Sequence, residues 1–203
     1  INWVNFAIEN ASDHGFDMYY YGNDTFFGCS AIGCGGNGWD NLYDKANLFF
    51  CISKNNGGKG YDLASGSGTG TTLIGCVAHN NGGDGIDLSS ISQGTIFNCV
   101  SDGNVNGIKV AGANNSILIA NRITNNSGYG IEGDIDPCWA AFNFLNMNNL
   151  GDIFGDGVLS INYLSPVDSN KTTGTVGYND LTNDDFNLTT DATMRDIAIS
   201  LPE

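Results

Sequence analysis

The stretch that decides the fold occurs twice in succession: residues 48–63 read LFFCISKNNGGKGYDL, and residues 73–88 read LIGCVAHNNGGDGIDL. A glycine followed by an aromatic or aliphatic residue and then a charged one recurs along the chain, at spacings of 23, 22, 25, 22 and 23 residues. The six copies are Gly15–Asp17, Gly38–Asp40, Gly60–Asp62, Gly85–Asp87, Gly107–Lys109 and Gly130–Glu132. Repeats of this length indicate a stacked architecture, because one repeat cannot bury its apolar face alone.

Two further rows keep this register. Nine residues before the glycine lie Phe6, Cys29, Cys51, Cys76 and, after a slip of one residue, Cys99. Five residues before it lie Asn10, Gly33, Asn55, Asn80, Asp102 and Asn125. We expect the cysteines to stack inside as buried free thiols, which behave as small apolar groups. We expect Asn55 and Asn80 to stack at one turn, as amide ladders do in cross-β structures.

Short strand-forming runs, many glycines and only three prolines favour β-strands joined by tight turns. Leucine-rich repeats need more leucines per unit, and calcium-binding nonapeptide rolls repeat every nine residues, so neither fits the period. The sequence therefore predicts an all-β fold, a right-handed parallel β-helix of about seven coils of roughly 22 residues, with three short strands per coil. We expect the coils over residues 1–155 and an irregular C-terminal cap over residues 156–203.

The chain is strongly acidic, with a net charge of −15 and only seven Lys plus Arg among its 203 residues. Such a surface excludes nucleic acid as the natural partner, because phosphate contacts require basic side chains. It serves solubility, or it binds divalent cations, which prefer carboxylate and carbonyl oxygens. No apolar run is long enough to span a membrane. Because the chain begins with Ile1, inside a coil, we expect a processed or truncated product that lacks an N-terminal cap.

The third position of the tripeptide carries the candidate chemistry. Strand side chains alternate, so if the middle residues point inward, the charged ones point outward and lie about 5 Å apart on neighbouring strands. Uncompensated carboxylates at that distance repel one another, and a cation resolves the conflict. Asp62, Asp84 and Asp87 therefore form a candidate Ca²⁺ site beside Lys109. The alternative is that Lys109 only neutralises Asp87 and Glu132 in an exposed ladder.

Two segments carry a family resemblance. Residues 76–88, quoted above, and residues 106–112, Asn-Gly-Ile-Lys-Val-Ala-Gly, resemble the calcium-dependent pectate lyases of the β-helix class that use a lysine base. The resemblance implies that Asp62, Asp84 and Asp87 bind Ca²⁺ and that Lys109 is the base. Gly83 stands where the family has its first acid, and Ala111 replaces a glycine.

The resemblance also implies an acidic, uronate-containing polysaccharide as substrate. The acidic tail, with Asp185–Leu188 ahead of Asp191–Ile197, is similar to the closing segment of many extracellular β-helix proteins, which implies an extracellular location. Lys109 would remove the C5 proton of a uronate, and β-elimination would expel the C4 glycosidic oxygen. Calcium would bind the sugar carboxylate and stabilise the developing negative charge. Dependence on metal and an alkaline optimum would follow. Arg122 either binds a substrate carboxylate through two hydrogen bonds or is a surface charge.

Two alternatives remain open. Residues 13–17, Asp-His-Gly-Phe-Asp, resemble part of the Gly-Phe-Asp-Pro-His-Glu region of β-helix uronate epimerases, which share the proton-abstraction step. A different class is a non-enzymatic rod in a phage tail, surface fibre or extracellular assembly, since fold does not imply function. In that case the tyrosines would stack sugars or pack a neighbouring subunit, and self-association is expected. They are Tyr19, Tyr20, Tyr21 and Tyr43.

Overall fold

The computed structural model describes residues 1–18, 23–42, 45–63, 70–89, 93–113, 115–133, 138–154, 178–180 and 185–188. Within these residues every regular element is a β-strand, so the predicted all-β fold is confirmed. Tyr19, Tyr20, Tyr21 and Tyr43 lie outside the described residues, as does most of the predicted C-terminal cap over residues 156–203. The described part of the chain contains no helix that is long and apolar enough to cross a membrane.

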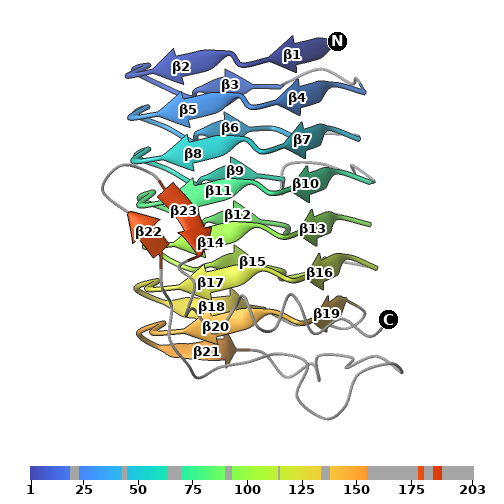
Figure 1. Cartoon of the computed structure of the whole chain (residues 1–203), viewed down its shortest axis with the longest axis vertical. Helices are drawn as coiled ribbons and strands as arrows, with labels where there is room; N and C mark the ends of the chain where they lie inside the picture. The colour runs from blue at the N-terminus through green and yellow to red at the C-terminus, as the bar shows by residue number, and fades with distance from the viewer. Residues whose placement is uncertain are drawn as a thin grey trace.

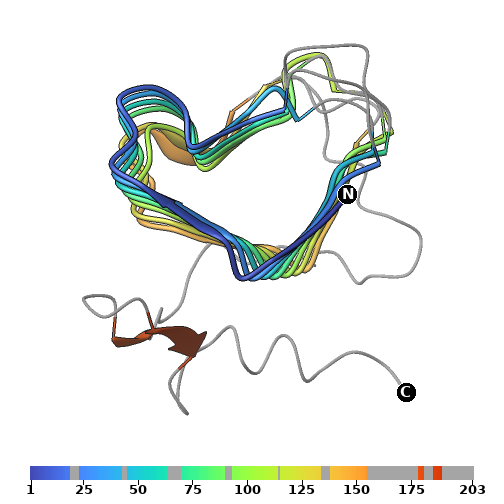
Figure 2. The ribbon, with the colours of Figure 1, turned by 90° about the horizontal axis from the view of Figure 1, so that it is seen from above.

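Three parallel sheets of seven strands each form the walls of a β-helix (Figures 1 and 2). Sheet A contains β1 (Asn2–Val4), β4 (Thr25–Phe27), β7 (Asn47–Phe49), β10 (Thr72–Ile74), β13 (Thr95–Phe97), β16 (Ile117–Ile119) and β19 (Trp139–Ala141). Sheet B contains β2 (Ala7–Glu9), β5 (Ser30–Ile32), β8 (Ile52–Lys54), β11 (Val77–His79), β14 (Val100–Asp102), β17 (Arg122–Thr124) and β20 (Phe144–Asn146).

Sheet C contains β3 (Phe16–Asp17), β6 (Trp39–Asp40), β9 (Tyr61–Asp62), β12 (Ile86–Asp87), β15 (Ile108–Lys109), β18 (Tyr129–Glu132) and β21 (Gly151–Phe154). The tripeptide that defines the repeat therefore forms sheet C. A separate antiparallel pair, β22 (Tyr178–Asp180) and β23 (Asp185–Leu188), lies outside sheet B (Figures 1 and 2).

The core is built from the inward residue of each strand. In sheet A the middle residue is buried from β4 onward, as Phe26, Leu48 and Leu73 illustrate, and Trp3 of β1 is partly buried. In sheet C the residue after the glycine points inward, and the rings of Phe16 and Trp39 stack with centroids 3.9 Å apart. One coil supplies one layer of this core, so each repeat is stabilised mainly by its two neighbours.

The predicted cysteine row is confirmed. Cys29, Cys51 and Cys76 have no exposed surface, and all six cysteines of the chain are free and buried. A hydrogen bond with the Cys76 thiol, together with burial, raises the pKa of Cys51 above the range of an ordinary thiol. Beyond Cys99 the row continues with asparagines. Asn121 and Asn143 occupy the same place in the next two coils, and Asn121 Nδ2 donates a hydrogen bond to Asn143 Oδ1 at 3.0 Å.

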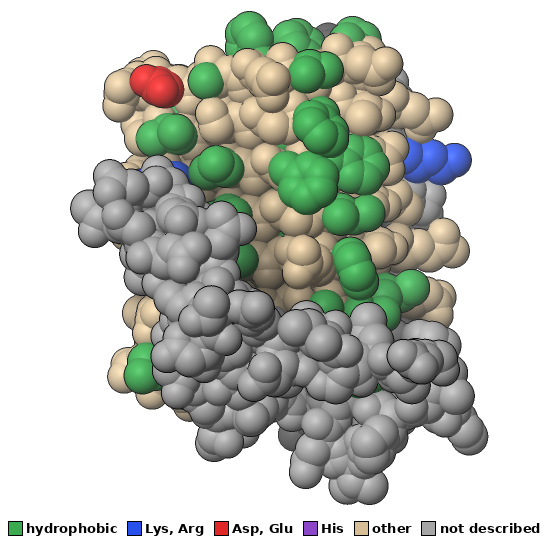
Figure 3. All heavy atoms as spheres, viewed as in Figure 1, with side chains coloured by type: hydrophobic (Ala, Val, Ile, Leu, Met, Phe, Trp, Pro, Cys, Tyr) green, Lys and Arg blue, Asp and Glu red, His purple; other side chains and the backbone are tan. Residues whose placement is uncertain are grey.

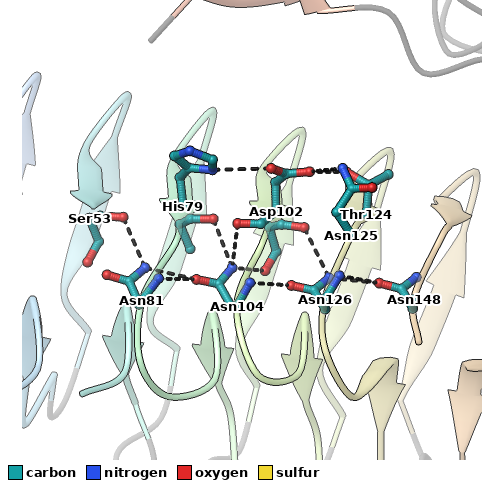
Figure 4. A network of polar contacts seen from close by, with 11 residues as sticks. Ser53, His79, Asn81, Asp102, Asn104, Thr124, Asn125, Asn126 and Asn148 are labelled. Carbon is teal, nitrogen blue, oxygen red and sulfur yellow. Dashed lines mark hydrogen bonds and ion pairs between the residues drawn. The ribbon is translucent and has the colours of Figure 1, made fainter. Parts of the chain in front are cut away.

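The predicted asparagine ladder is wrong by one residue. Asn55 and Asn80 are exposed and adopt a left-handed backbone, with φ of 56° and 52°. The ladder is formed by the buried asparagines that follow this turn position, each of which bonds to the next coil (Figure 4). Its members are Asn56, Asn81, Asn104, Asn126 and Asn148. In the fifth coil the turn position belongs to Gly103, with φ of 70°, because Asp102 lies in β14.

Candidate functional site

Sheet C brings the outward charges into the predicted register. Asp87 pairs with Asp62 on one side and with Lys109 on the other, and Lys109 pairs with Glu132. Asp17 and Asp40 pair in the same way at the N-terminal end. The structure therefore brings Asp62, Asp87 and Lys109 together on three consecutive strands, as the sequence predicts.

A second row faces these charges. It consists of the residue immediately before each of the first five glycines of the repeat: His14, Asn37, Lys59, Asp84 and Asn106. Before the sixth glycine the place belongs to Tyr129. The Lys59 ammonium lies 3.1 Å from Asp62 Oδ2 and 2.6 Å from Asp87 Oδ2. Asn37 donates to Asp62 Oδ2 at 3.3 Å and also to Asp40. The two rows interlock, because Asn37 and Lys59 each contact charged residues of two successive coils. Asp84 and Asn106 extend the contacts to Lys109 and Glu132.

Lys59 is the functional residue that sequence reasoning missed, and it changes the electrostatics of the face. Burial by itself would raise the pKa of Asp87, but hydrogen bonds from Lys59 and Ser89 outweigh it and the pKa of Asp87 is lowered. Burial by itself would lower the pKa of Lys59, but its contacts with Asp87 and Asp62 outweigh it and the pKa of Lys59 is raised. Both shifts stabilise the charged forms of the pair.

Lys109 lies at the C-terminal part of the same face. Its ammonium lies 3.6 Å from Glu132 Oε2 and 3.9 Å from Asp84 Oδ2, and a third of its side chain is exposed. Asn106 bridges the same two acids, with its amide nitrogen 2.8 Å from Asp84 Oδ1 and 2.8 Å from Glu132 Oε2. Lys109 is therefore a counter-ion to Asp84 and Glu132, and its side chain is more exposed than either of theirs.

The premise that the carboxylates are uncompensated is wrong. Asp62 and Asp87 share Lys59, and Asp84 is bonded to Asn106 and lies near Lys109. Across the described ranges, no group of three or more His, Cys, Asp or Glu side chains is arranged to hold a metal ion. As arranged, Asp62, Asp84 and Asp87 do not fit a calcium ion unless Lys59 moves away. Their role as calcium ligands stays a prediction.

Arg122 is not brought to this face. It lies on β17 of sheet B, in register with Val100 and Phe144, and only 3% of its surface is exposed. The alternative of a plain surface charge is therefore wrong for Arg122. Its predicted contact with a substrate carboxylate is untested, and the side chain is not open to solvent where it stands.

Sheet B holds a second polar network, centred on Asp102 (Figure 4). Asp102 accepts hydrogen bonds from Thr124 Oγ1 at 2.6 Å and Asn125 Nδ2 at 2.7 Å, and its Oδ2 lies 3.2 Å from His79 Nδ1. Burial would raise the pKa of Asp102, but the bonds from His79, Thr124 and Asn125 outweigh it and the pKa is lowered. Both His79 and Asp102 are buried, so the network braces three neighbouring coils.

The histidine of the epimerase-like segment lies at the N-terminal end of sheet C. His14 Nδ1 accepts a hydrogen bond from the backbone N–H of Asn37 at 2.9 Å. His14 Nε2 lies 3.3 Å from Asp13 Oδ1 and 3.8 Å from Asp40 Oδ2. These contacts place His14 in the same interlocked rows as Lys59, where it links two coils.

Comparison with known proteins supports the fold. A family model described as "Right handed beta helix region" matches residues 51–185, which bears out the predicted right-handed sense. No curated protein matches the chain. A similar solved structure is that of QnrB1, a plasmid-mediated fluoroquinolone resistance protein, at 15% identity and a TM-score of 0.23, with 76% of this chain and 91% of that chain covered. Likeness at that level carries no argument about activity.

Proposed function

The chain belongs to the right-handed β-helix family, and from that premise we propose that it is a non-enzymatic, rigid module of an extracellular or surface assembly. The observation that carries this proposal is the Lys59 ammonium, which lies within 3.1 Å of both Asp62 and Asp87. It fills the space between the two carboxylates that a calcium-dependent site would need.

The interlocked rows of sheet C suit a structural role. Lys59 joins Asp62 of its own coil to Asp87 of the next coil, and both carboxylates are almost fully buried, with side-chain exposures of 11% for Asp62 and 4% for Asp87. Pairs of this kind are costly to break, because the remaining charge is left buried without its partner. A face held in this way resists bending of the coil stack and keeps the rod straight.

The structural proposal is tested by an assay for lyase activity. Purified protein is incubated with pectate and with alginate, at neutral and at alkaline pH, with calcium and with chelator, and the ultraviolet absorbance of unsaturated uronate ends is followed. We expect no product under any condition and no change of melting temperature on chelation. Product that forms with calcium and disappears with chelator would overturn the structural proposal.

A second candidate is the calcium-assisted lyase acting on an acidic polysaccharide. The observation that favours it is Lys109, which is in register with Asp87, is one-third exposed and lies on the face of the candidate ligands Asp62, Asp84 and Asp87. In this candidate Lys109 takes the C5 proton of the uronate, and calcium supplies the charge that holds the substrate carboxylate against so acidic a chain. Arg122 would have to become exposed to take part.

Lys109→Arg separates the two candidates. Arginine keeps the positive charge but is effectively never deprotonated, so it cannot act as a base. If the chain is a lyase, the variant keeps its fold and loses turnover by about 100-fold or more, the scale of general-base effects. If the wild type makes product and Lys109→Arg makes it equally fast, the base is another residue and Lys109 is only a counter-ion.

A further inference from the structure

Sheet A differs from the rest of this acidic chain because it carries no charge. Its seven strands contain no Asp, Glu, Lys, Arg or His in any position. Its first outward row is mostly Asn and Thr, as Thr25, Thr72 and Thr95 illustrate. The whole chain has a net charge of −15, so an uncharged outer face of two side-chain rows over seven strands is a distinct surface.

The second outward row of sheet A is apolar along its length. We call it the apolar stripe; its members, in register from coil to coil, are Val4, Phe27, Phe49, Ile74, Phe97 and Ile119. Val4 is 63% exposed, Phe27 48% and Phe97 42%, whereas Phe49, Ile74 and Ile119 are half-buried. Figure 3 shows hydrophobic side chains forming a band along the coils where sheets A and B meet. Contiguous exposed apolar surface rimmed by polar residues marks a site of interaction.

The stripe is reinforced at the turn that follows sheet A. Phe50 is 54% exposed, and its ring lies edge-on to that of Phe27 with centroids 5.5 Å apart. The ring also covers the backbone of Gly75 in the next coil, where an added Cβ would lie 2.6 Å from Phe50 Cδ1. These aromatic groups are exposed and already held in place, so a partner would have little side-chain entropy to remove on binding.

We propose that the apolar stripe binds a second copy of this chain, so that two β-helices pack side by side through sheet A. The charge distribution indicates which face a second copy would use. Two chains with a net charge of −15 repel each other through most of their surfaces, and sheet A is a face on which they can meet without opposing like charges. The stripe also repeats at every strand, so it can lie against its own image about a two-fold axis. The inference goes beyond the structural function proposed above and does not depend on it.

The size of the face sets the expected strength. Six steps of about 4.8 Å along the coils and about 10 Å across the strands give roughly 300 Å² per copy. The total of about 600 Å² is below the 1,200–2,000 Å² of stable interfaces and falls in the class of weak, reversible contacts. We therefore expect a concentration-dependent dimer rather than an obligate one.

The proposed dimer should depend on the salt concentration in a characteristic way. Raising the salt concentration screens the repulsion between two acidic chains, and the apolar contact does not rely on opposite charges. The dimer should therefore strengthen as salt is raised. A contact made through complementary charges, such as one with a basic partner, would weaken instead.

The experiment is sedimentation equilibrium of the whole chain over about 10 µM to 1 mM, which covers weak dissociation constants. We expect the mean mass to rise from that of the 21.4 kDa monomer toward twice that value, and to rise further in high salt. Phe27→Thr with Phe97→Thr should weaken association at least tenfold, since threonine already occupies the adjacent row and suits a strand. Thr72→Glu, which adds like charge to the face and leaves the stripe intact, should weaken it as well.

Val105→Thr is the matched control, because Val105 is 40% exposed and lies in the turn between sheets B and C. It should associate like the wild type, and circular dichroism and melting should show that every variant folds. A wild type that stays monomeric at the highest concentration overturns the proposal. A double variant Phe27→Thr, Phe97→Thr that dimerises like the wild type also overturns it. A monomeric wild type that binds a neutral polysaccharide through the stripe overturns it as well.

Discussion

Sheets A and C are built by the same coils at the same strand spacing, yet their outward faces are opposites. Sheet C presents an acid or a lysine on six successive strands, from Asp17 to Glu132. Sheet A presents none. The difference is the second row of sheet C, where Lys59 and Asn106 supply partners for the acids. A β-helix face can hold stacked charges only where a neighbouring row interlocks with them.

Removing Lys59 should break the charged face most severely. In Lys59→Met, Asp62 and Asp87 are left as like charges on adjacent strands, both largely buried. We expect the free energy of unfolding to fall by about 2–4 kcal/mol, somewhat less than for a fully buried pair because Lys59 is partly exposed. Chemical denaturation measures it. Lys45→Met, at an exposed turn lysine, is the control and should change stability by less than about 0.5 kcal/mol. A loss in Lys59→Met as small as that of the control would mean that the ion pairs of Lys59 do not stabilise the fold.

The same variant tests whether Lys59 stands in for a metal. With the ammonium gone, the carboxylates of Asp62 and Asp87 lose their shared partner and can bind a divalent cation, together with Asp84, which keeps its contacts with Asn106 and Lys109. A ligand that binds only the folded state stabilises it by about 2.7 kcal/mol at 100 times its dissociation constant. We expect added Ca²⁺ to raise the melting temperature of Lys59→Met and to leave the wild type unchanged.

Adding Asp84→Ala and Asp87→Ala to the Lys59→Met background should abolish that response. If the wild type responds to Ca²⁺ as strongly as Lys59→Met does, Lys59 does not block the site. The lyase candidate would then replace the structural one as the better account of sheet C.

Acid should weaken sheet C through Asp87. The pKa of Asp87 is lowered in the folded protein by Lys59 and Ser89, against the effect of burial. The stability it contributes is therefore present above the unfolded pKa of about 3.9 and is lost as pH falls through the lower folded value. We expect Asp87→Asn to show a shallower loss of unfolding free energy below about pH 4 than the wild type. Asp13→Asn, at a side chain that is 83% exposed, should follow the wild type; a wild-type slope in Asp87→Asn would contradict the assignment.

The smallest change in stability is expected when charged residues are introduced on sheet A. Thr72 and Thr95 are direct cross-strand partners, so Thr72→Asp with Thr95→Asp places two acids side by side without a second row to neutralise them. We expect a loss of about 0.5–1 kcal/mol, the scale of cross-strand pairs. Thr72→Lys with Thr95→Asp should recover most of it, as measured by thermal unfolding. If the two double variants are equally stable, the neutrality of sheet A is not a matter of fold stability.

Much of the fold was predictable because the repeat is local. The alternation within each coil turns Cys51 and Cys76 toward the core and Asp62 and Asp87 toward the outer face of sheet C, and stacking then aligns them without further information. It does not predict that Asp62 and Asp87 are buried on that face. The asparagine ladder failed by one residue. Asn55 and Asn56 are identical in chemistry, and only the left-handed φ of 56° at Asn55 turns its neighbour inward.

The sequence by itself determined the period, the three strands of each coil, the rows that face inward and the register that brings Asp87 between Asp62 and Lys109. These follow from backbone alternation and from the coil length, which one repeat already contains. Only the tertiary structure decided which partners the charges take. Lys59 has a long side chain that reaches its own coil and the next, so its position between Asp62 and Asp87 depends on how two coils stack. The burial of Arg122 on sheet B is likewise a finding of the tertiary structure, because no local pattern in the sequence predicts it.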